Sequence, residues 1–402
     1  MTLALNSTIS KLLAYCRAED WSGYDPYDAL NSRVFEAVPL LNSRIPRIAF
    51  TQLLKRSPVN VRGIVGIPKT QNSKALALFL SAFLQLTDKE LPDREQLIRS
   101  MSERLAHLRS GDTRFWCWGY NFPWQGRKVV VPNGAPNLVC TTFVANAVLD
   151  LYEQHSEPQW LEMAVSSAEY LLAELYWANE GAAGFSYPLP KLTNQIYNAN
   201  FLAAALLSRV YRHTGLEKFV EPALRAARFS ASQQQQDGSW FYGEAESQRW
   251  IDNFHTGYNL GALRCVSRNL GTSEFDECML RGFNFYRAHF FREDNATRYF
   301  HNRTYPIDIH CVAQSILTLL AFKDLEGSNE ALANSVALWA MKHMWDERGF
   351  FYYRVLRTCT IRIPYMRWSQ AWMMLALSTL FRESTAREES LAVQESDGLV
   401  TA

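Results

Sequence analysis

Asp237-Gly-Ser-Trp-Phe-Tyr-Gly-Glu244 is followed closely by Trp250-Ile-Asp-Asn-Phe-His-Thr-Gly-Tyr258 in this chain of 402 residues. The first stretch is typical of an aromatic turn bounded by glycines, and the second is typical of a helix start crowded with polar groups. Weaker copies of this arrangement recur about every fifty to sixty residues. That period predicts a ring of helical hairpins whose polar helix starts meet at one mouth around a central cavity.

Helical hydrophobic periodicity occurs in consecutive pairs along the chain. The first helices of the pairs are expected at 74–84, 137–155, 194–213, 254–270, 308–322 and 367–382. The second helices are expected at 93–110, 158–177, 216–233, 273–291 and 329–345, and a helix at about 7–18 completes the last pair. First helices are rich in Ala and Leu and second helices carry more charge, as expected of an inner barrel wrapped by an outer one.

We therefore predict an all-α fold, an (α/α)6-type toroid of six hairpins or seven, with short aromatic strands or turns at one mouth. The aromatic segments are 115–120, 184–188, 238–243, 298–301 and 349–354. An open solenoid is the alternative, but solenoid repeats are usually shorter, roughly 30 to 47 residues. Residues 1–382 are expected to form this single domain, and the polar, acidic segment 383–402 is expected to be a disordered tail.

Composition narrows the classes of function. Aromatic residues make up 13% of the chain, with 12 Trp and 18 Tyr, and flat side chains can stack on the apolar faces of sugar rings, although most of them are expected to fill the core. The formal net charge of +1 gives no overall field that would favour nucleic acid or an anionic membrane.

The N-terminus and the cysteines bear on localisation. Met1-Thr-Leu-Ala-Leu-Asn lacks a basic n-region, and no window reaches the roughly 18 apolar residues of a membrane span. The 7 cysteines are scattered and lack CxxC spacing, which suits reduced thiols. We expect a cytoplasmic protein with no membrane span, no cofactor and no nucleic-acid partner.

The strongest catalytic candidates are Asp252, His255 and Tyr258, because a helix that starts near Asn253 brings them to adjoining faces of its first turns. The alternative is that Asp252 only caps the helix. His310 opens the next inner helix and could serve acid/base chemistry, and the spacing of nearby His and Cys residues is too sparse to predict a metal site.

The last repeat offers a second group, in which arginines lie close to tyrosines in the sequence. Arg354 and Arg367 could hold a sugar carboxylate while Tyr353 moves a proton. A packing seam with solvated arginines is the alternative. The expected substrate-binding residues are Trp116, Trp240, Tyr242, Glu244, Trp250, Asp28, Arg354 and Arg367.

Two of these, Glu244 and Asp28, are carboxylates and leave hydrolysis open. A glycosidase would place its paired carboxylates about 6.5–9.5 Å apart for inversion or about 5–5.5 Å apart for retention.

Two resemblances add to this interpretation. The turn Gln236-Asp-Gly-Ser-Trp240 resembles those of α/α-toroid proteins, which include six-hairpin glycosidases, terpenoid cyclases and uronyl epimerases. The segments 23–32 and 250–258 look like those of a poorly characterised bacterial family associated with exopolysaccharide and capsule biosynthesis. This resemblance implies a glycan or oligosaccharide substrate and polysaccharide synthase machinery as a partner.

The predicted function is glycan processing in polysaccharide biosynthesis by acid/base chemistry, of the epimerase or lyase type or of the glycoside hydrolase type. A non-catalytic scaffold that binds a glycan or a synthase is the first alternative. A zinc-dependent enzyme like the lanthionine cyclases is the second, because Trp116-Cys-Trp-Gly119 is similar to their zinc-cysteine segment. The partner Cys-His-Gly motif of those enzymes is absent here.

Overall fold

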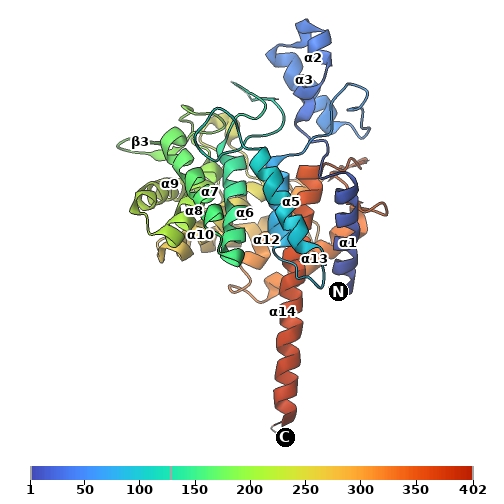
Figure 1. Ribbon diagram of the computed structural model, residues 1–402, viewed down its shortest axis with the longest axis vertical. Helices are drawn as coiled ribbons and strands as arrows, with labels where there is room; N and C mark the ends of the chain where they lie inside the picture. Colours follow the sequence, from blue (N-terminus) through green and yellow to red (C-terminus); the bar gives the residue numbers. More distant parts are fainter. Residues whose placement is uncertain (1, 127–128, 401–402) are drawn as a thin grey trace.

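A computed structural model describes residues 2–126 and 129–400 of the chain. Within these residues six helical hairpins surround a common axis (Figure 1). The inner helices are α4 (Ser73–Phe83), α6 (Leu138–His155), α8 (Tyr197–Thr214), α10 (Asn253–Leu270), α12 (Ile309–Ala321) and α14 (Trp372–Val400). Each inner helix packs on the next, and α14 packs on α4 and so closes the ring.

The outer helices are α5 (Arg94–His107), α7 (Pro158–Tyr170), α9 (Val220–Ser232), α11 (Asp276–His289), α13 (Ser328–His343) and α1 (Thr2–Ala18). Each packs on its inner partner, and α1 packs on α14, so the chain ends close the last hairpin. The predicted toroid is confirmed, with six hairpins rather than seven in the described residues.

Polar side chains start most of the inner helices. Asn72, Asn137, Asp252 and Asp308 each accept a backbone N–H of the first turn of their helix. Such a cap stabilises a helix by about 1 kcal/mol. Because the inner helices run in one direction, these caps all lie at the same end of the ring, the predicted mouth.

Short antiparallel strand pairs lie at the mouth. The strands are β1 (Trp124–Gln125), β2 (Val130–Val131), β3 (Tyr176–Ala178), β4 (Ala183–Phe185), β5 (Ile307–Asp308), β6 (Trp345–Asp346), β7 (Phe350–Phe351), β8 (Arg354–Val355) and β9 (Thr360–Ile361). Successive repeats are linked there, since Asn253 N donates to Tyr299 O at 2.9 Å and Ile309 N donates to Tyr353 O at 3.2 Å. The predicted aromatic strands and turns are therefore present.

Short helical turns complete the body: η3 (Leu171–Leu175), η4 (Glu217–Phe219), η5 (Glu246–Gln248) and η6 (Met366–Ala371), of which η3 and η6 are π-helical. No helix in the described part of the chain is long and apolar enough to cross a membrane. The helix α14 continues to Val400, and the disorder expected for 383–402 stays a prediction. Residues 401 and 402 lie outside the described residues.

Residues 33–69 form a feature that the sequence did not predict, and we call them the cap. They contain α2 (Val34–Ala37), η2 (Pro39–Leu41) and α3 (Arg44–Arg56), and they follow η1 (Asp28–Asn31). Figure 1 shows α2 and α3 as a projection at one end of the molecule, opposite the end toward which α14 runs. Since α14 starts at the mouth, the cap lies at the same end of the ring as the mouth.

Candidate active site at the mouth of the ring

The capping carboxylate of α10 also holds a histidine. Asp252 Oδ1 accepts the backbone N–H of His255 at 3.0 Å, and His255 Nδ1 lies 2.8 Å from Asp252 Oδ2. Trp250 Nε1 donates to Asp252 Oδ2 at 3.0 Å. With Nδ1 bound to the carboxylate, the other ring nitrogen, Nε2, is the one left for proton transfer.

An aromatic face lies beside this pair. Tyr242 and Trp250 stack with ring centroids 4.6 Å apart and an angle of 11° between the rings, and Tyr242 also contacts His255. These side chains line a narrow pocket together with Asp252, Asn198 and other residues of the same turns. The His255 side chain is 20% exposed, so it borders solvent at the mouth.

A second histidine lies deeper in the ring. His310 Nε2 is 2.7 Å from Tyr258 Oη, across the interface between α12 and α10. The imidazole stacks on Phe254 and on Trp372, with centroids 4.5 Å away in each case. Its Nδ1 is buried and has no hydrogen-bond partner among the described residues.

Burial lowers the pKa of His310 well below its usual value, and the nearby charges of Lys74 and Arg367 lower it further. The ring is therefore neutral near pH 7, which leaves one nitrogen able to accept a proton. Burial likewise raises the pKa of Tyr258. Phe254 contacts both histidine rings, with ring centroids 4.0 Å apart for His255 and 4.5 Å apart for His310. It therefore connects the two histidines within one candidate site.

Both oxygens of Asp308, the capping residue of α12, accept hydrogen bonds from the protein. Asp308 Oδ1 accepts the backbone N–H of His310 at 2.9 Å and Trp368 Nε1 at 2.8 Å. Its Oδ2 accepts Nε of Arg354. All three contacts hold the carboxylate in place and fix the start of α12, where His310 lies. Arg354, which the sequence suggested for substrate binding, is thus paired within the protein.

Two further aspartates are paired with arginines. Arg367 binds Asp25 through two hydrogen bonds, of 2.6 and 2.8 Å. Arg62, from the cap, donates to Asp28 at 2.8 Å and is fully buried. Burial raises the pKa of Asp28 to about 6, although the charge of Arg62 opposes the shift. Asp28 and Arg367 therefore lie at the mouth but bind protein partners.

A lysine lies at the centre of the ring, and no carboxylate among the described residues pairs with it. Lys74, in the first turn of α4, is 3% exposed. Its Nζ lies 3.8 Å from the centroid of the Phe143 ring and 5.2 Å from that of Trp372. Burial lowers its pKa well below the usual value, and Arg367 adds to the effect. Buried amines of this kind are common at functional sites.

The mouth is closed. A pocket lined by Asp25, Asn72 and Arg367 among others has a volume of about 10 Å³, the space of about one water molecule. The pocket beside His255 is narrower still. The cap is attached nearby, because Lys55 Nζ donates to Tyr27 Oη at 2.5 Å and Tyr27 packs on Trp368. Neither of these two pockets has room for a sugar ring in this conformation.

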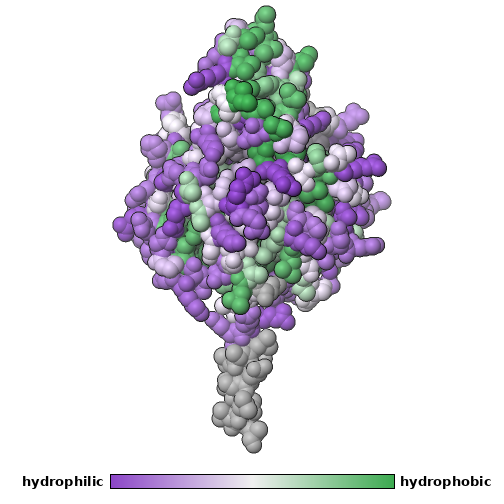
Figure 2. Space-filling model, turned by 90° about the vertical axis from the view of Figure 1, so that its right-hand side faces the viewer, coloured by the Kyte–Doolittle hydropathy of each residue, from purple (hydrophilic) through white to green (hydrophobic). Residues whose placement is uncertain are grey.

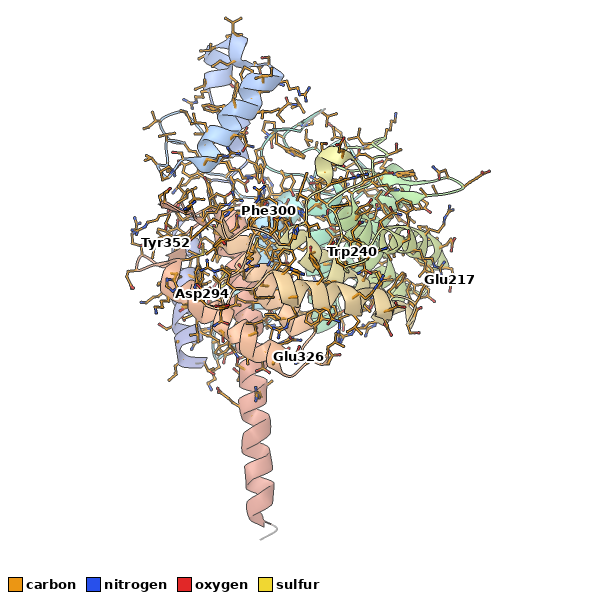
Figure 3. All side chains as sticks on the ribbon, turned by 180° about the vertical axis from the view of Figure 1, so that it is seen from behind. Glu217, Trp240, Asp294, Phe300, Glu326 and Tyr352 are labelled. Carbon is orange, nitrogen blue, oxygen red and sulfur yellow. The ribbon has the colours of Figure 1, made fainter. Side chains whose placement is uncertain are left out.

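Four predicted residues lie away from the histidine pair or inside the core. Trp240 is 1% exposed, and its Nε1 donates to Ser230 O at 3.1 Å; Figure 3 shows it within the body, below the projection of α2 and α3. Because it is buried, its ring offers no stacking face. Trp116 packs on Trp118 and under Arg109, which follows the end of α5. Glu244 is exposed in its loop.

Tyr353 is fully buried, packs on Tyr365, and has an unpaired hydroxyl. Within the described residues no group of three His, Cys, Asp or Glu side chains is placed to hold a metal ion. Cys117, the cysteine of the segment compared with zinc cyclases, is buried.

Sequence reasoning missed several residues of the site, namely Lys74, Lys55, Arg62 and Phe254. A signal for Lys74 was present, because it is the only charged residue in Ser73-Lys-Ala-Leu-Ala-Leu-Phe-Leu-Ser-Ala-Phe83, an otherwise apolar inner helix. No comparable signal marks Lys55 or Arg62, since each belongs to a segment with many basic residues.

No protein-family model matches this sequence. No curated protein matches it either.

Solved structures share the fold. A cellobiose 2-epimerase from Bacillus thermoamylovorans superposes with a TM-score of 0.59 and 12% identity, over 79% of this chain and 90% of that one. A GH76 α-mannanase from Bacteroides thetaiotaomicron gives 0.60 and 10%, over 79% and 88%. A D-mannose isomerase gives 0.60 and 10%, over 80% and 88%. At these identities the likeness establishes the (α/α)6 toroid.

Proposed function

We propose that this protein is a carbohydrate-active enzyme that moves a proton at a sugar carbon, as an epimerase or isomerase does. One observation carries the proposal: a neutral, buried His310 with a free ring nitrogen lies across Phe254 from a second histidine, His255, whose Nδ1 is held by Asp252. Two imidazoles in different environments are suited to act as base and acid.

The chemistry needs both groups. In an open-chain aldose, the hydrogen on the carbon next to the carbonyl is weakly acidic. His310, as the base, takes that proton, and the electron pair moves onto the carbonyl oxygen to give an enolate. Return of a proton from the other histidine to the opposite face of the same carbon gives the epimer. Its return to the former carbonyl carbon gives the ketose, provided that the hydroxyl proton of the adjacent carbon moves to the former carbonyl oxygen, so that the new carbonyl forms at that adjacent carbon. No atom is gained or lost.

The aromatic face supports substrate binding. The stacked rings of Tyr242 and Trp250 border His255, and a sugar that lies on them would bring its polar edge to the imidazole. The solved structures of similar fold include a cellobiose 2-epimerase and a D-mannose isomerase, which favours this substrate class.

Hydrolysis is less well supported, because a glycosidase needs carboxyl groups that are free to act as acid and as base or nucleophile. Asp25 binds Arg367, Asp28 binds Arg62, and Asp308 binds Arg354 and Trp368. The fourth buried aspartate, Asp252, holds His255.

The sequence resemblance of segments 23–32 and 250–258 supports a finer proposal. We place the reaction in polysaccharide biosynthesis in the cytoplasm, on an oligosaccharide or glycan precursor, next to a polysaccharide synthase.

A second candidate is binding without turnover, as a scaffold for a glycan or a synthase. The closed mouth favours a scaffold for a synthase over one that holds a glycan in the cleft, since the pocket beside Asp25 has room for about one water.

The test is a turnover screen of reducing mono- and disaccharides and uronic-acid oligosaccharides, with products identified by NMR. We expect the wild type to give an epimer or ketose, and His255→Asn to be slower by about a hundredfold or more. His213→Asn, a histidine paired with Glu153 away from the mouth, is the matched control and should be unaffected. Chain cleavage would replace the proposal by hydrolysis, and saturable binding without any product would replace it by the scaffold.

A further inference from the structure

The outer surface of the cap is unusually apolar for an exposed region. Seven large apolar side chains are exposed there: Val38, Leu40, Leu41, Ile45, Leu53, Val59 and Ile64. They are half of the exposed large apolar side chains among the described residues. Leu40 is 89% exposed and Ile64 is 87% exposed. Figure 2 shows this apolar surface over the narrow end of the molecule.

The inner side of the same segment explains why the outer side has no core to join. Leu54 and Ile67 pack on Ala29 in a small cluster of their own. Lys55 and Arg62 reach inward to Tyr27 and Asp28. The cap is therefore anchored through one side, and its apolar outer residues have no partner within the described chain.

The charge of the cap indicates what kind of partner it would bind. Residues 33–69 contain seven lysines and arginines and one acidic residue, Glu36. The whole chain has a net charge of +1, so the remainder is acidic and the positive charge is concentrated on the cap. Arg33, Arg44 and Arg56 are exposed and form no ion pair with any described residue.

We propose that the cap docks on the surface of an anionic lipid bilayer. Its exposed Leu and Ile side chains enter the acyl boundary, and its arginines bind lipid phosphates. This inference goes beyond the proposed function and does not depend on it. Surface helices that combine a basic and an apolar face bind membranes in this way, with each basic residue near the surface adding about fivefold, or about 1 kcal/mol, to the affinity.

The shape of the cap favours a bilayer over a folded protein. The cap projects from the body (Figure 1), and Leu40, Ile45 and Ile64, at 78% exposure or more, stand out from it. A fluid bilayer accommodates such projecting side chains directly, whereas a protein partner would need a matching groove lined with acidic residues. Docking of this kind turns the mouth of the ring toward the membrane.

The test measures sedimentation of the full-length protein with vesicles of phosphatidylcholine alone and of phosphatidylcholine and phosphatidylglycerol in equal parts. We expect binding to the mixed vesicles, and weaker binding to the neutral ones. The triple variant Leu40→Ser/Ile45→Ser/Ile64→Ser and the double variant Arg44→Glu/Arg56→Glu should each bind the mixed vesicles at least about tenfold more weakly.

The matched control variants carry substitutions of the same kind outside the cap. Leu280→Ser/Leu325→Ser/Leu338→Ser changes three exposed apolar residues elsewhere, and Lys89→Glu/Lys342→Glu changes two exposed lysines elsewhere; both should bind like the wild type. Thermal unfolding checks that every variant is folded. Failure of the wild type to bind mixed vesicles overturns the proposal, and so does equal loss in the controls. Self-association that only the cap variants abolish, without vesicle binding, assigns the surface to a second copy of the chain instead.

Discussion

The two histidines of the mouth differ in their surroundings, and this difference carries the functional argument. His255 is bound to a carboxylate and borders solvent, whereas His310 is enclosed by aromatic rings and stays neutral. Their sequence neighbourhoods predicted one of these environments. The spacing of Asp252 and His255 already placed carboxylate and imidazole together on one turn, but the contact of Tyr258 with His310 joins two helices and was not predictable from spacing.

The pH dependence of folding stability should show that His310 is neutral in the folded state. The unfolded chain binds a proton at this residue with a pKa of about 6.5, while burial lowers the pKa in the folded state. Below about pH 6.5 the unfolded state therefore binds more protons than the folded state. As the pH is lowered through this range, the free energy of unfolding decreases by up to about 1.4 kcal/mol per pH unit.

Urea unfolding at a series of pH values measures this slope. His310→Leu should remove its contribution, and Tyr258→Phe, which removes the hydrogen bond but keeps the imidazole, should retain it. Equal slopes in the wild type and His310→Leu would show that the histidine does not titrate as described.

Lys74 should lower the stability of the fold. A buried amine without an acceptor is destabilising, so Lys74→Met is expected to raise the free energy of unfolding by about 1–2 kcal/mol. Lys89→Met, at an exposed site, should change it by less than about 0.5 kcal/mol. Chemical denaturation tests both. If Lys74→Met is instead clearly less stable than the wild type, the amine is satisfied by an interaction that the structure does not contain.

Among the elements, the turn-plus-helix unit was predictable and the cap was not. Capping residues and glycine-bounded aromatic turns are local signals, and they gave the inner helices and their order around the ring. The helix α3 carries its apolar residues on a surface outside the core, with Leu53 65% exposed. Rules based on hydrophobic periodicity assume that the apolar side of a helix faces the core. They therefore do not predict a helix whose apolar side chains face solvent.

The glycine of the Asp237-Gly-Ser-Trp240 turn is required by both conformation and space. Gly238 has a φ of +89°, and a Cβ there would lie 2.4 Å from Arg281 O of the next outer helix. We expect Gly238→Ala to destabilise the protein by about 2–4 kcal/mol.

Gly261, on α10, is the control, because an added Cβ there meets nothing within 4 Å. Gly261→Ala should stabilise the helix by up to about 1 kcal/mol. Thermal unfolding distinguishes the two, and a neutral Gly238→Ala would mean that the turn is not a rigid joint between repeats.

For the whole molecule, a closed toroid and the gathering of polar helix starts at one mouth followed from the repeat. The pairing of Asp25, Asp28 and Asp308 with arginines did not, because such partners lie far apart in the sequence; Asp25 and Arg367 are 342 positions apart in the chain. Chain closure brings them together, and only the three-dimensional ring reveals that the predicted substrate-binding arginines are already occupied.

The contact between Lys55 and Tyr27 should hold the cap in place. Lys55→Ala removes a hydrogen bond to Tyr27, and we expect amide hydrogen exchange in residues 33–69 to become about five- to thirtyfold faster, which corresponds to about 1–2 kcal/mol. Mass spectrometry of the exchanged peptides measures it. Lys342→Ala, on the surface of α13, should leave the rate unchanged. An unchanged rate in Lys55→Ala would mean that other contacts hold the cap in place.

The central claim, proton transfer by the two histidines, is tested most directly by incubating the protein with reducing sugars in deuterated water and locating the label by NMR. The account predicts deuterium at the carbon next to the carbonyl with the wild type, and none above background with His255→Ala or with His310→Ala, both folded. Label incorporation that persists in both variants, or sugar conversion without any incorporation from solvent by the wild type, would contradict it.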